Sequence, residues 1–253
     1  MTVRELYREL SLLYPRELSA EWDNDGVMVS GDLDAPVRHV LCALDVTEAT
    51  VREAERVGAD LILSHHPLVF RPLSSVTEDS AVGRRVVALL AKGISVLSFH
   101  TRADAAVGGV NDLLAVELGL ADTSRFGEGG IGVIGSLPEA VTGASLADRV
   151  KAALGAPLVL LGDSGRPVCR VAVVGGSGKD EIGAALAAGA DALVSGRLSY
   201  ETVNEASELG ITLIEAGHFF TEAALPRQWA QMLPERFSGI SATYYDSCRV
   251  IVK

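Results

Sequence analysis

Cysteine is scarce in this chain, with three residues in 253. Cys42, Cys169 and Cys248 lie far apart, each inside an apolar run, and no two of them have the C-x-x-C spacing of a zinc or redox motif. A disulfide framework is therefore excluded, and the cysteines are predicted to be small core residues in a reducing compartment.

Long hydrophobic runs are also absent. No uncharged apolar stretch approaches the roughly 20 residues that a membrane helix requires. The N-terminal sequence MTVRELYRELSLLYP lacks the charged-then-apolar order of a secretory leader. We therefore expect a cytoplasmic protein without a membrane partner.

Basic residues are outnumbered, with 22 lysines and arginines against 33 acidic residues and a formal net charge of −11. No run of lysines and arginines could follow a phosphate backbone, so nucleic acid is not expected as a partner. A small anionic substrate is still compatible with this charge, because bound cations reverse the potential at a local site.

The residues that are plentiful are typical of a globular α/β protein: 48% are hydrophobic, 22% are charged and 26 are glycine. There is no G-x-S-x-G nucleophile elbow, so acyl-enzyme chemistry is not favoured. The string GGSGKD at 175–180 follows the apolar run VAVV, but it is neither a P-loop nor a dinucleotide-binding fingerprint. We interpret it first as a tight strand-to-helix turn and second as a phosphate contact.

Helices and strands alternate through the first half of the chain. Thr2 and Glu5 form a capping box ahead of an amphipathic helix that Pro15 ends. Asp23 and Asp25 lie in DNDG, which is interpreted as a turn in preference to a ligand pair. The following elements are predicted strands at 38–45, 60–64 and 94–99, and predicted helices at 48–57, 80–92 and 109–118. Strands separated by helices indicate parallel pairing and an α/β lobe.

The second half resembles the first. EAERVGADLILSHH at 53–66 matches AALAAGADALVSGR at 184–197, and GISVLSFHTRAD at 93–104 matches GITLIEAGHFFTE at 210–222. Two matches in the same order favour internal duplication. We predict two similar α/β lobes with largely parallel sheets, 1–127 and 128–253, with the boundary in a glycine-rich stretch. The sequence leaves open whether a C-terminal strand at 243–252 completes the second lobe or returns to the first.

Four of the five histidines lie at the ends of predicted strands, where α/β sheets bind ligands. These are His65, His66, His100 and His218, whereas His39 is interpreted as an ordinary residue. A single histidine of this kind is more often structural than functional. Four together favour a functional site.

Two of these histidines occur in His-x-x-x-carboxylate units. If a helix begins at the histidine, His100 with Asp104 and His218 with Glu222 share a face and offer an imidazole beside a carboxylate. The alternative is that the carboxylates only complement a helix dipole. That alternative does not explain the paired histidines.

His65 and His66 are adjacent, and adjacent residues of an extended strand point to opposite faces. The two imidazoles therefore serve two different cations, or one of them lies in an outer shell. Together with Asp104, His218 and Glu222 they make five donors, with His100 in reserve. A single zinc site with an open position needs three protein ligands. The surplus predicts two divalent cations about 3.5–4 Å apart.

The same segments resemble a known family. The chain is similar to the GTP cyclohydrolase type 2 homologue family, also called Ngg-interacting-factor-three-like, over nearly its whole length, and five strings carry the resemblance. They are EWDNDG (21–26), CALDVTEATVREAERVGADLILSHHPLVF (42–70), SFHTRADAAVGGVNDLLA (98–115), GGSG (175–178) and GITLIEAGHFFTEAALP (210–226).

The resemblance implies two α/β lobes with a dinuclear metal centre between them, in a toroidal homohexamer, and the short form of the family without an inserted domain. The family's metal ligands correspond to His65, His66, Asp104, His218 and Glu222. His100 corresponds to a histidine close to the metals, outside their first shell. One position departs from the family: many members have a histidine after the tyrosine of YETVNEA, where this chain has Glu201.

The leading functional hypothesis is a metal-dependent, cyclohydrolase-like hydrolase that acts on a nucleotide or another phosphorylated small molecule. A metal-activated water would attack the substrate, with His100 as proton carrier. The alternative is a non-catalytic metal-binding or metal-delivery protein, or an oligomeric scaffold. Mixed histidine and carboxylate ligands suit zinc, iron, manganese or nickel, so the metal is left open.

Overall fold

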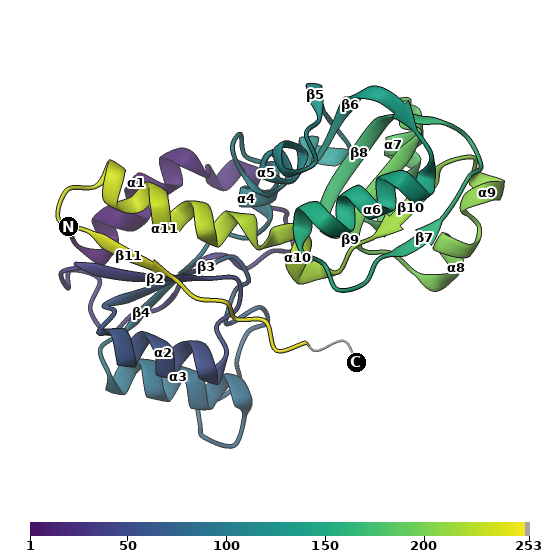
Figure 1. Cartoon of the computed structure of the whole chain (residues 1–253). Coiled ribbons are helices and arrows are strands. Elements are labelled where there is room, and N and C mark those ends of the chain that lie inside the picture. The colour runs from purple at the N-terminus through teal and green to yellow at the C-terminus, as the bar shows by residue number, and fades with distance from the viewer. Residues whose placement is uncertain (251–253) are drawn as a thin grey trace. The chain divides into compact units, whose positions relative to one another are not determined.

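A computed structural model of the chain describes residues 1–250, and Figure 1 shows its helices and strands. The chain divides into two compact units. The first combines Met1–Ala103 with Leu225–Arg249, and the second contains Asp104–Ala224 and Val250. Each unit has its own sheet, so each is described by itself.

The first unit is built on a five-stranded sheet in the order β1-β4-β3-β2-β11. Its strands are β1 (Gly26–Val29), β2 (His39–Ala43), β3 (Leu61–Ser64), β4 (Ser95–Ser98) and β11 (Ser241–Tyr244). All neighbours pair in parallel except β1, which runs antiparallel to β4. Parallel order brings the carboxyl ends of β2, β3 and β4 to one edge of the sheet.

Helices cover both faces of this sheet (Figure 1). They are α1 (Val3–Leu13), α2 (Glu48–Val57), α3 (Ala81–Ala91) and α11 (Ala224–Arg236), with a 3-10 turn at Arg16–Leu18. Helices α2 and α3 cover one face, and α1 and α11 cover the other. The predicted capping box of Thr2 and Glu5 is present at the start of α1. On the α11 side, the fully buried Trp229 donates from Nε1 to the hydroxyl of Tyr14 at 2.9 Å.

The second unit has a mixed six-stranded sheet in the order β5-β6-β8-β9-β10-β7. Its strands are β5 (Ala121–Phe126), β6 (Gly132–Val141), β7 (Leu160–Gly162), β8 (Val168–Ser177), β9 (Ala192–Arg197) and β10 (Thr212–Glu215). Strands β8, β9 and β10 are parallel, and the other three strands pair antiparallel at the two sides.

Alternate residues of β8 enter two different cores, because successive side chains of a strand point to opposite faces. Val171 and Val173 pack with α5 and α6, whereas Ala172 and Val174 pack with α7 and α9. The helices are α5 (Val110–Glu117), α6 (Gly143–Leu154), α7 (Ile182–Ala187), α8 (Tyr200–Asn204), α9 (Ala206–Leu209) and α10 (His218–Glu222), with 3-10 turns at Glu128–Gly130 and Lys179–Glu181.

The α/β fold with two sheets is confirmed, and the predicted elements of the first half are present to within two residues at each end. The open question of the C-terminal strand is answered by β11, which pairs with β2 and so lies in the sheet of the first unit. The predicted strand at 243–252 extends into residues 251–253, outside the described part. The compact units change at 103/104, within the short helix α4 (Thr101–Ala105), whereas the sequence placed a boundary at 127/128. The duplication stays a prediction.

Candidate metal centre

Three histidines of the first unit meet at the carboxyl ends of two neighbouring strands. His65 and His66 follow β3, and His100 follows β4, its parallel neighbour. The ring centroids of His65 and His66 are 5.0 Å apart, and that of His100 lies 5.2 and 5.7 Å from them. Each ring offers one nitrogen within 4.8 Å of the others, which is close enough for a shared metal ion.

The rings of His65 and His66 can both join this cluster because the two residues lie beyond the end of β3. Strand β3 ends at Ser64, and the backbone bends at His65 and His66. The alternation of an extended strand, on which the sequence interpretation relied, therefore does not apply here. The Ser64 hydroxyl stabilises the bend by donating to the His66 carbonyl at 2.9 Å.

The Nδ1 atom of each ligand candidate in this bend is tied to an oxygen of the same unit. His65 Nδ1 lies 2.9 Å from the carbonyl oxygen of Phe99, and His66 Nδ1 lies 2.7 Å from Oδ1 of Asp45. Both partners are acceptors, so Nδ1 carries the proton and donates. Nε2 then holds the lone pair that a metal needs, and the ring orientation is fixed.

Asp45 follows β2, the third strand that ends at this edge, and it is held by the C-terminal segment. Its backbone N–H donates to the Ser247 hydroxyl at 3.1 Å, and the hydroxyl lies 3.3 Å from Oδ2 of Asp45. Ser247 is buried, at 3% exposure. A serine near the end of the chain thus supports the carboxylate that orients His66.

His100 is oriented by Asp23 in the same way. His100 Nδ1 donates to Oδ1 of Asp23 at 2.9 Å, and Oδ2 accepts from the backbone N–H and the hydroxyl of Thr101 at 3.0 and 2.6 Å. Burial by itself would raise the pKa of Asp23, but the hydrogen bonds and the charge of His100 outweigh it and lower the pKa to about 2. Asp23 is therefore an ionised acceptor.

The turn that carries Asp23 is anchored by a buried arginine. Arg102 is fully buried, donates from Nε to Asp25 at 2.9 Å and from Nη1 to the Tyr14 carbonyl at 3.2 Å, and stacks over Phe99 with 4.2 Å to the ring centroid. A buried charge is stable only when paired and hydrogen-bonded. This pair joins the EWDNDG turn to the start of α4, where His100 begins the HTRAD string.

In the second unit, α10 brings His218 and Glu222 together. His218 Nε2 lies 3.1 Å from Oε2 of Glu222, which confirms the expected i, i+4 pair on one helix face. The Glu222 carboxylate is buried, whereas the His218 side chain is 44% exposed. Asp104 is also buried, and its backbone carbonyl accepts from the Asn111 amide at 3.2 Å.

Three glycines make room for α10. A side chain at Gly176 would collide with Oε1 of Glu222 and would come within 3.2 Å of His218 Nε2, and one at Gly175 would lie 3.4 Å from the Glu222 side chain. On β9, a Cβ at Gly196 would lie 2.7 Å from the His218 backbone. The glycines of the GGSG string thus allow α10, the His218–Glu222 helix, to pack closely against β8. The α-helix that follows the string in the chain is α7, which has six residues.

Comparison with known proteins places the chain in a family. The family model described as Duf34/NIF3 (NGG1p interacting factor 3) matches residues 1–247. The chain belongs to the NIF3 family. A curated relative from Clostridium perfringens (strain 13 / Type A), named GTP cyclohydrolase 1 type 2 homolog, is 34% identical over 246 residues, 94% of each chain.

Solved structures agree with this NIF3 assignment. A protein from Thermus thermophilus has a TM-score of 0.84 at 30% identity and covers 99% of this chain and 100% of its own. A Bacillus cereus protein related to NIF3 reaches a TM-score of 0.91 at 24% identity, covering 100% of this chain and 99% of its own, and so shares the fold.

The donor chemistry of this NIF3 chain fits a transition metal. The fit is carried by the three-histidine cluster of the first unit, in which carbonyl or carboxylate oxygens hold every Nδ1. Imidazole suits zinc, iron and nickel, and the buried carboxylates of the second unit, Asp104 and Glu222, are donors of the kind that manganese prefers. His39, at the opposite end of β2, bonds the Thr243 hydroxyl at 2.9 Å and is structural, as predicted.

Two residues that bond the clustered histidines were not predicted from the sequence. Asp23 was interpreted as a turn residue, and Asp45 had no predicted role. Both are carboxylates just before or after an apolar strand, which is the only signal the sequence held. Glu201, the departure from the family pattern, lies exposed on α8 in the second unit.

Within residues 1–250, no helix has the length and apolar character needed to cross a membrane. Of the cysteines, Cys42 is fully buried, and burial raises the pKa of its thiol, whereas Cys169 and Cys248 are half-buried. The prediction of small core cysteines is therefore correct for Cys42 and too strong for the other two.

Proposed function

We propose that this NIF3-family chain holds two divalent cations and hydrolyses a nucleotide or another phosphorylated small molecule. The proposed ligands are His65, His66, Asp104, His218 and Glu222. The observation that carries the proposal is the histidine cluster of the first unit, in which each Nδ1 has an acceptor and each ring offers one nitrogen within 4.8 Å of the others.

The chain's own residues divide the work. When bound, two divalent cations would lower the pKa of a coordinated water and neutralise charge on substrate oxygens. His66 is held for metal binding by Asp45, and His65 by the carbonyl of Phe99. His100 is the proposed proton carrier, because Asp23 occupies its Nδ1 and leaves Nε2 as the atom that takes or gives a proton.

The substrate class is proposed from the relatives. Curated relatives are named GTP cyclohydrolase 1 type 2 homolog, which supports a nucleotide-like substrate. A phosphate ester suits an acidic protein at this place because the proposed cations supply the positive charge that the chain lacks. Zinc, iron, manganese and nickel all match the donor set.

The test is metal analysis of protein purified without a histidine tag, followed by a substrate screen. We expect two ions per chain at saturation. His65→Ala and Glu222→Ala should each cut occupancy sharply, whereas His39→Ala should not. One ion per chain with a single anomalous peak would overturn the dinuclear centre.

The screen then separates catalysis from binding. Turnover of GTP or another phosphorylated compound that disappears with a chelator and returns with added metal would support the hydrolase. Two tightly held ions without turnover across nucleoside triphosphates, monophosphates and sugar phosphates would favour the non-catalytic alternative, a metal-binding or metal-delivery protein.

A further inference from the structure

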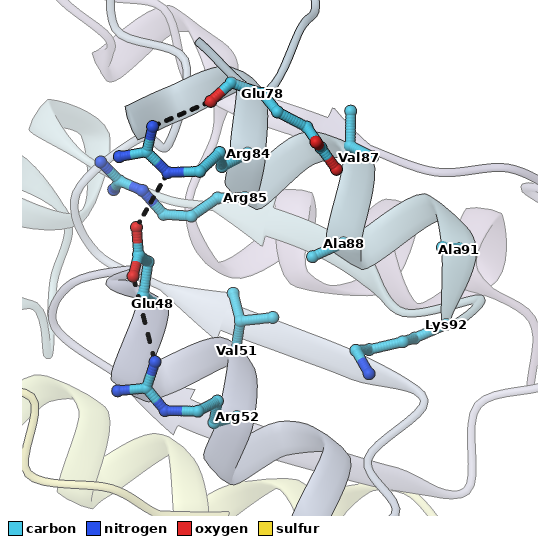
Figure 2. Close-up of a pocket in the computed structure, with 10 residues that line it drawn as sticks. All are labelled: Glu48, Val51, Arg52, Glu78, Arg84, Arg85, Val87, Ala88, Ala91 and Lys92. Atoms are coloured by element: carbon cyan, nitrogen blue, oxygen red, sulfur yellow. Dashed lines mark hydrogen bonds and ion pairs between the residues drawn. The ribbon is translucent and has the colours of Figure 1, made fainter. Parts of the chain in front are cut away.

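A surface cavity lies between α2 and α3, the two helices that cover one face of the first sheet (Figure 2). Its volume is about 410 Å³, within the range of roughly 300–1,000 Å³ that small-molecule sites occupy. The floor is apolar and consists of Val51 from α2 and Val87, Ala88 and Ala91 from α3. The described residues that line it include none of the proposed metal ligands.

The charged residues of this cavity are unusual for so acidic a chain. Figure 2 shows Arg52, Arg84 and Arg85 at one end of the cavity, around the carboxylate of Glu48, and Glu78 is the second acidic residue of the lining. A neighbouring cavity of about 380 Å³ shares Glu48, Arg52 and Arg85 and adds Arg249. Arg84 and Arg85 are adjacent in the sequence, but Arg52 and Arg249 lie far from them, so no basic run indicated this positive patch.

The patch is incompletely neutralised. Among the described residues, Glu48 is the one carboxylate bonded to these arginines, at 3.3 Å from Nε of Arg84 and 4.0 Å from Nη1 of Arg52, and its side chain is 53% exposed. Lys92, at the other end, is already paired with Glu55. The positive excess is therefore concentrated at the arginine end.

Two of the guanidinium groups are held in place by uncharged acceptors. Arg85 donates to the carbonyls of Ala81 and Val46 at 2.8 and 2.7 Å, and Arg84 donates to the Glu78 carbonyl at 2.8 Å. Carbonyl contacts fix the geometry of a guanidinium without cancelling its charge. Fixed, charged forks of this kind match the oxygens of a phosphate.

We propose that this α2–α3 cavity binds a small organic phosphate, independently of the metal centre. The phosphate bonds Arg84 and Arg85 and displaces the exposed carboxylate of Glu48. The apolar or aromatic body of the ligand lies on Val51 and Ala88. Both parts are required, because the cavity joins an apolar floor to a cationic end.

The probe is phenyl phosphate, titrated into the intact protein and followed by backbone amide NMR and calorimetry. Saturable binding should shift amides of residues 47–52 and 84–92. Inorganic phosphate should bind more weakly, and benzyl alcohol should not saturate. Equal affinity for inorganic and phenyl phosphate would overturn the role of the apolar floor, and shifts confined to residues around His65 would overturn the site.

Three variants sharpen the test. Arg84→Gln should weaken phenyl phosphate by about tenfold, as expected for one charge-assisted hydrogen bond. Glu48→Gln should tighten it, because the competing carboxylate is gone. Arg56→Gln is the matched control: Arg56 is also on α2 and pairs with Glu53, outside the cavity.

A fourth variant tests whether binding in the cavity is independent of the metal centre. His65→Ala should leave binding in the cavity unchanged even if it abolishes metal binding and turnover. An equal loss of phenyl phosphate affinity in Arg84→Gln and Arg56→Gln would overturn the proposal. So would unchanged affinity both in Glu48→Gln and in the wild type at reduced salt, since each should bind phenyl phosphate more tightly. Its failure would leave the proposed hydrolase untouched, since no residue is shared.

Discussion

His66 Nδ1 lies 2.7 Å from Oδ1 of Asp45, and this contact fixes which nitrogen of the ring is available to a metal. A carboxylate behind a ligating histidine raises the basicity of the ring and holds its orientation. The same carboxylate is bonded by Ser247, so its position depends on a residue 202 positions later in the chain.

Asp45→Asn should lower metal affinity, because the amide removes the charge that polarises His66. We expect a loss of roughly 10- to 100-fold, measured by competition with a chromophoric chelator. Ser247→Ala should have a smaller effect of the same sign. Asp60→Asn is the control, since Asp60 bonds backbone N–H groups of Arg38 and His39 and should alter stability alone. Equal affinity in all three variants would contradict an orienting role.

Gly176→Ala should displace the Glu222 carboxylate, because the added methyl group occupies its place. Gly189→Ala is a matched control: both glycines have positive φ, +62° and +81°, but a methyl group at 189 meets nothing within 4 Å. Both changes should lower the free energy of unfolding by about 1 kcal/mol through backbone strain. Only Gly176→Ala should also lose metal. Equal metal contents in the two variants would contradict the proposal that Gly176 makes room for a metal-binding Glu222.

His100→Ala should keep both metals and lose most of any hydrolytic activity, if His100 carries protons. His100→Gln should rescue little, because an amide cannot carry a proton at neutral pH. Metal content and rate are measured on the same samples. A fall in metal affinity that added metal partly reverses would make His100 a ligand instead, and undiminished turnover at full occupancy would remove it from the mechanism.

Asp23 should contribute to stability above about pH 4 and progressively less in stronger acid. Its pKa is lowered from 3.8 to about 2 in the folded protein, so the contribution is complete above the unfolded value and disappears as pH falls through the folded one. The groups that face it are His100 and Thr101. The size is on the order of 2 kcal/mol.

Urea unfolding of chelator-treated protein measures this contribution. The difference in unfolding free energy between wild type and Asp23→Asn should be largest near pH 5 and should shrink toward pH 2. A difference that stays constant across this range would mean that Asp23 acts through shape rather than charge.

The homohexamer implied by the family resemblance is a prediction of assembly. Solution scattering and sedimentation at micromolar concentration should report six copies in a ring. A compact monomer under the same conditions would contradict it, and metal removal beforehand tests whether assembly depends on the bound ions.

Local signals explain why much of this fold could be predicted. The capping box at Thr2 and the 3.6-residue spacing of Val3, Leu6 and Leu10 define α1 without reference to the rest of the chain. The pairing of β11 with β2 could not be predicted, because strand partners so far apart in the chain share no local pattern.

The candidate site was likewise predictable only in part. Histidines at strand ends were recognisable because few other reasons place them there. Asp23 and Asp45 were not, since an aspartate in a turn has a sufficient local explanation and only the fold shows that it faces a histidine ring. The arginines of the α2–α3 cavity could not be predicted either, because Arg52 and Arg84 line the same cavity only after folding.

The return of the C-terminal segment to the first sheet determines which unit can complete its fold first during synthesis. Residues 104–224 are contiguous and can fold as they emerge from the ribosome, whereas the first unit lacks α11 and its edge strand β11 until residues 225–249 have been synthesised. Ser247, which is translated 202 residues after Asp45, supports the carboxylate behind His66. A nascent chain therefore lacks the Ser247 support of Asp45, the carboxylate behind His66, until residue 247 has been synthesised.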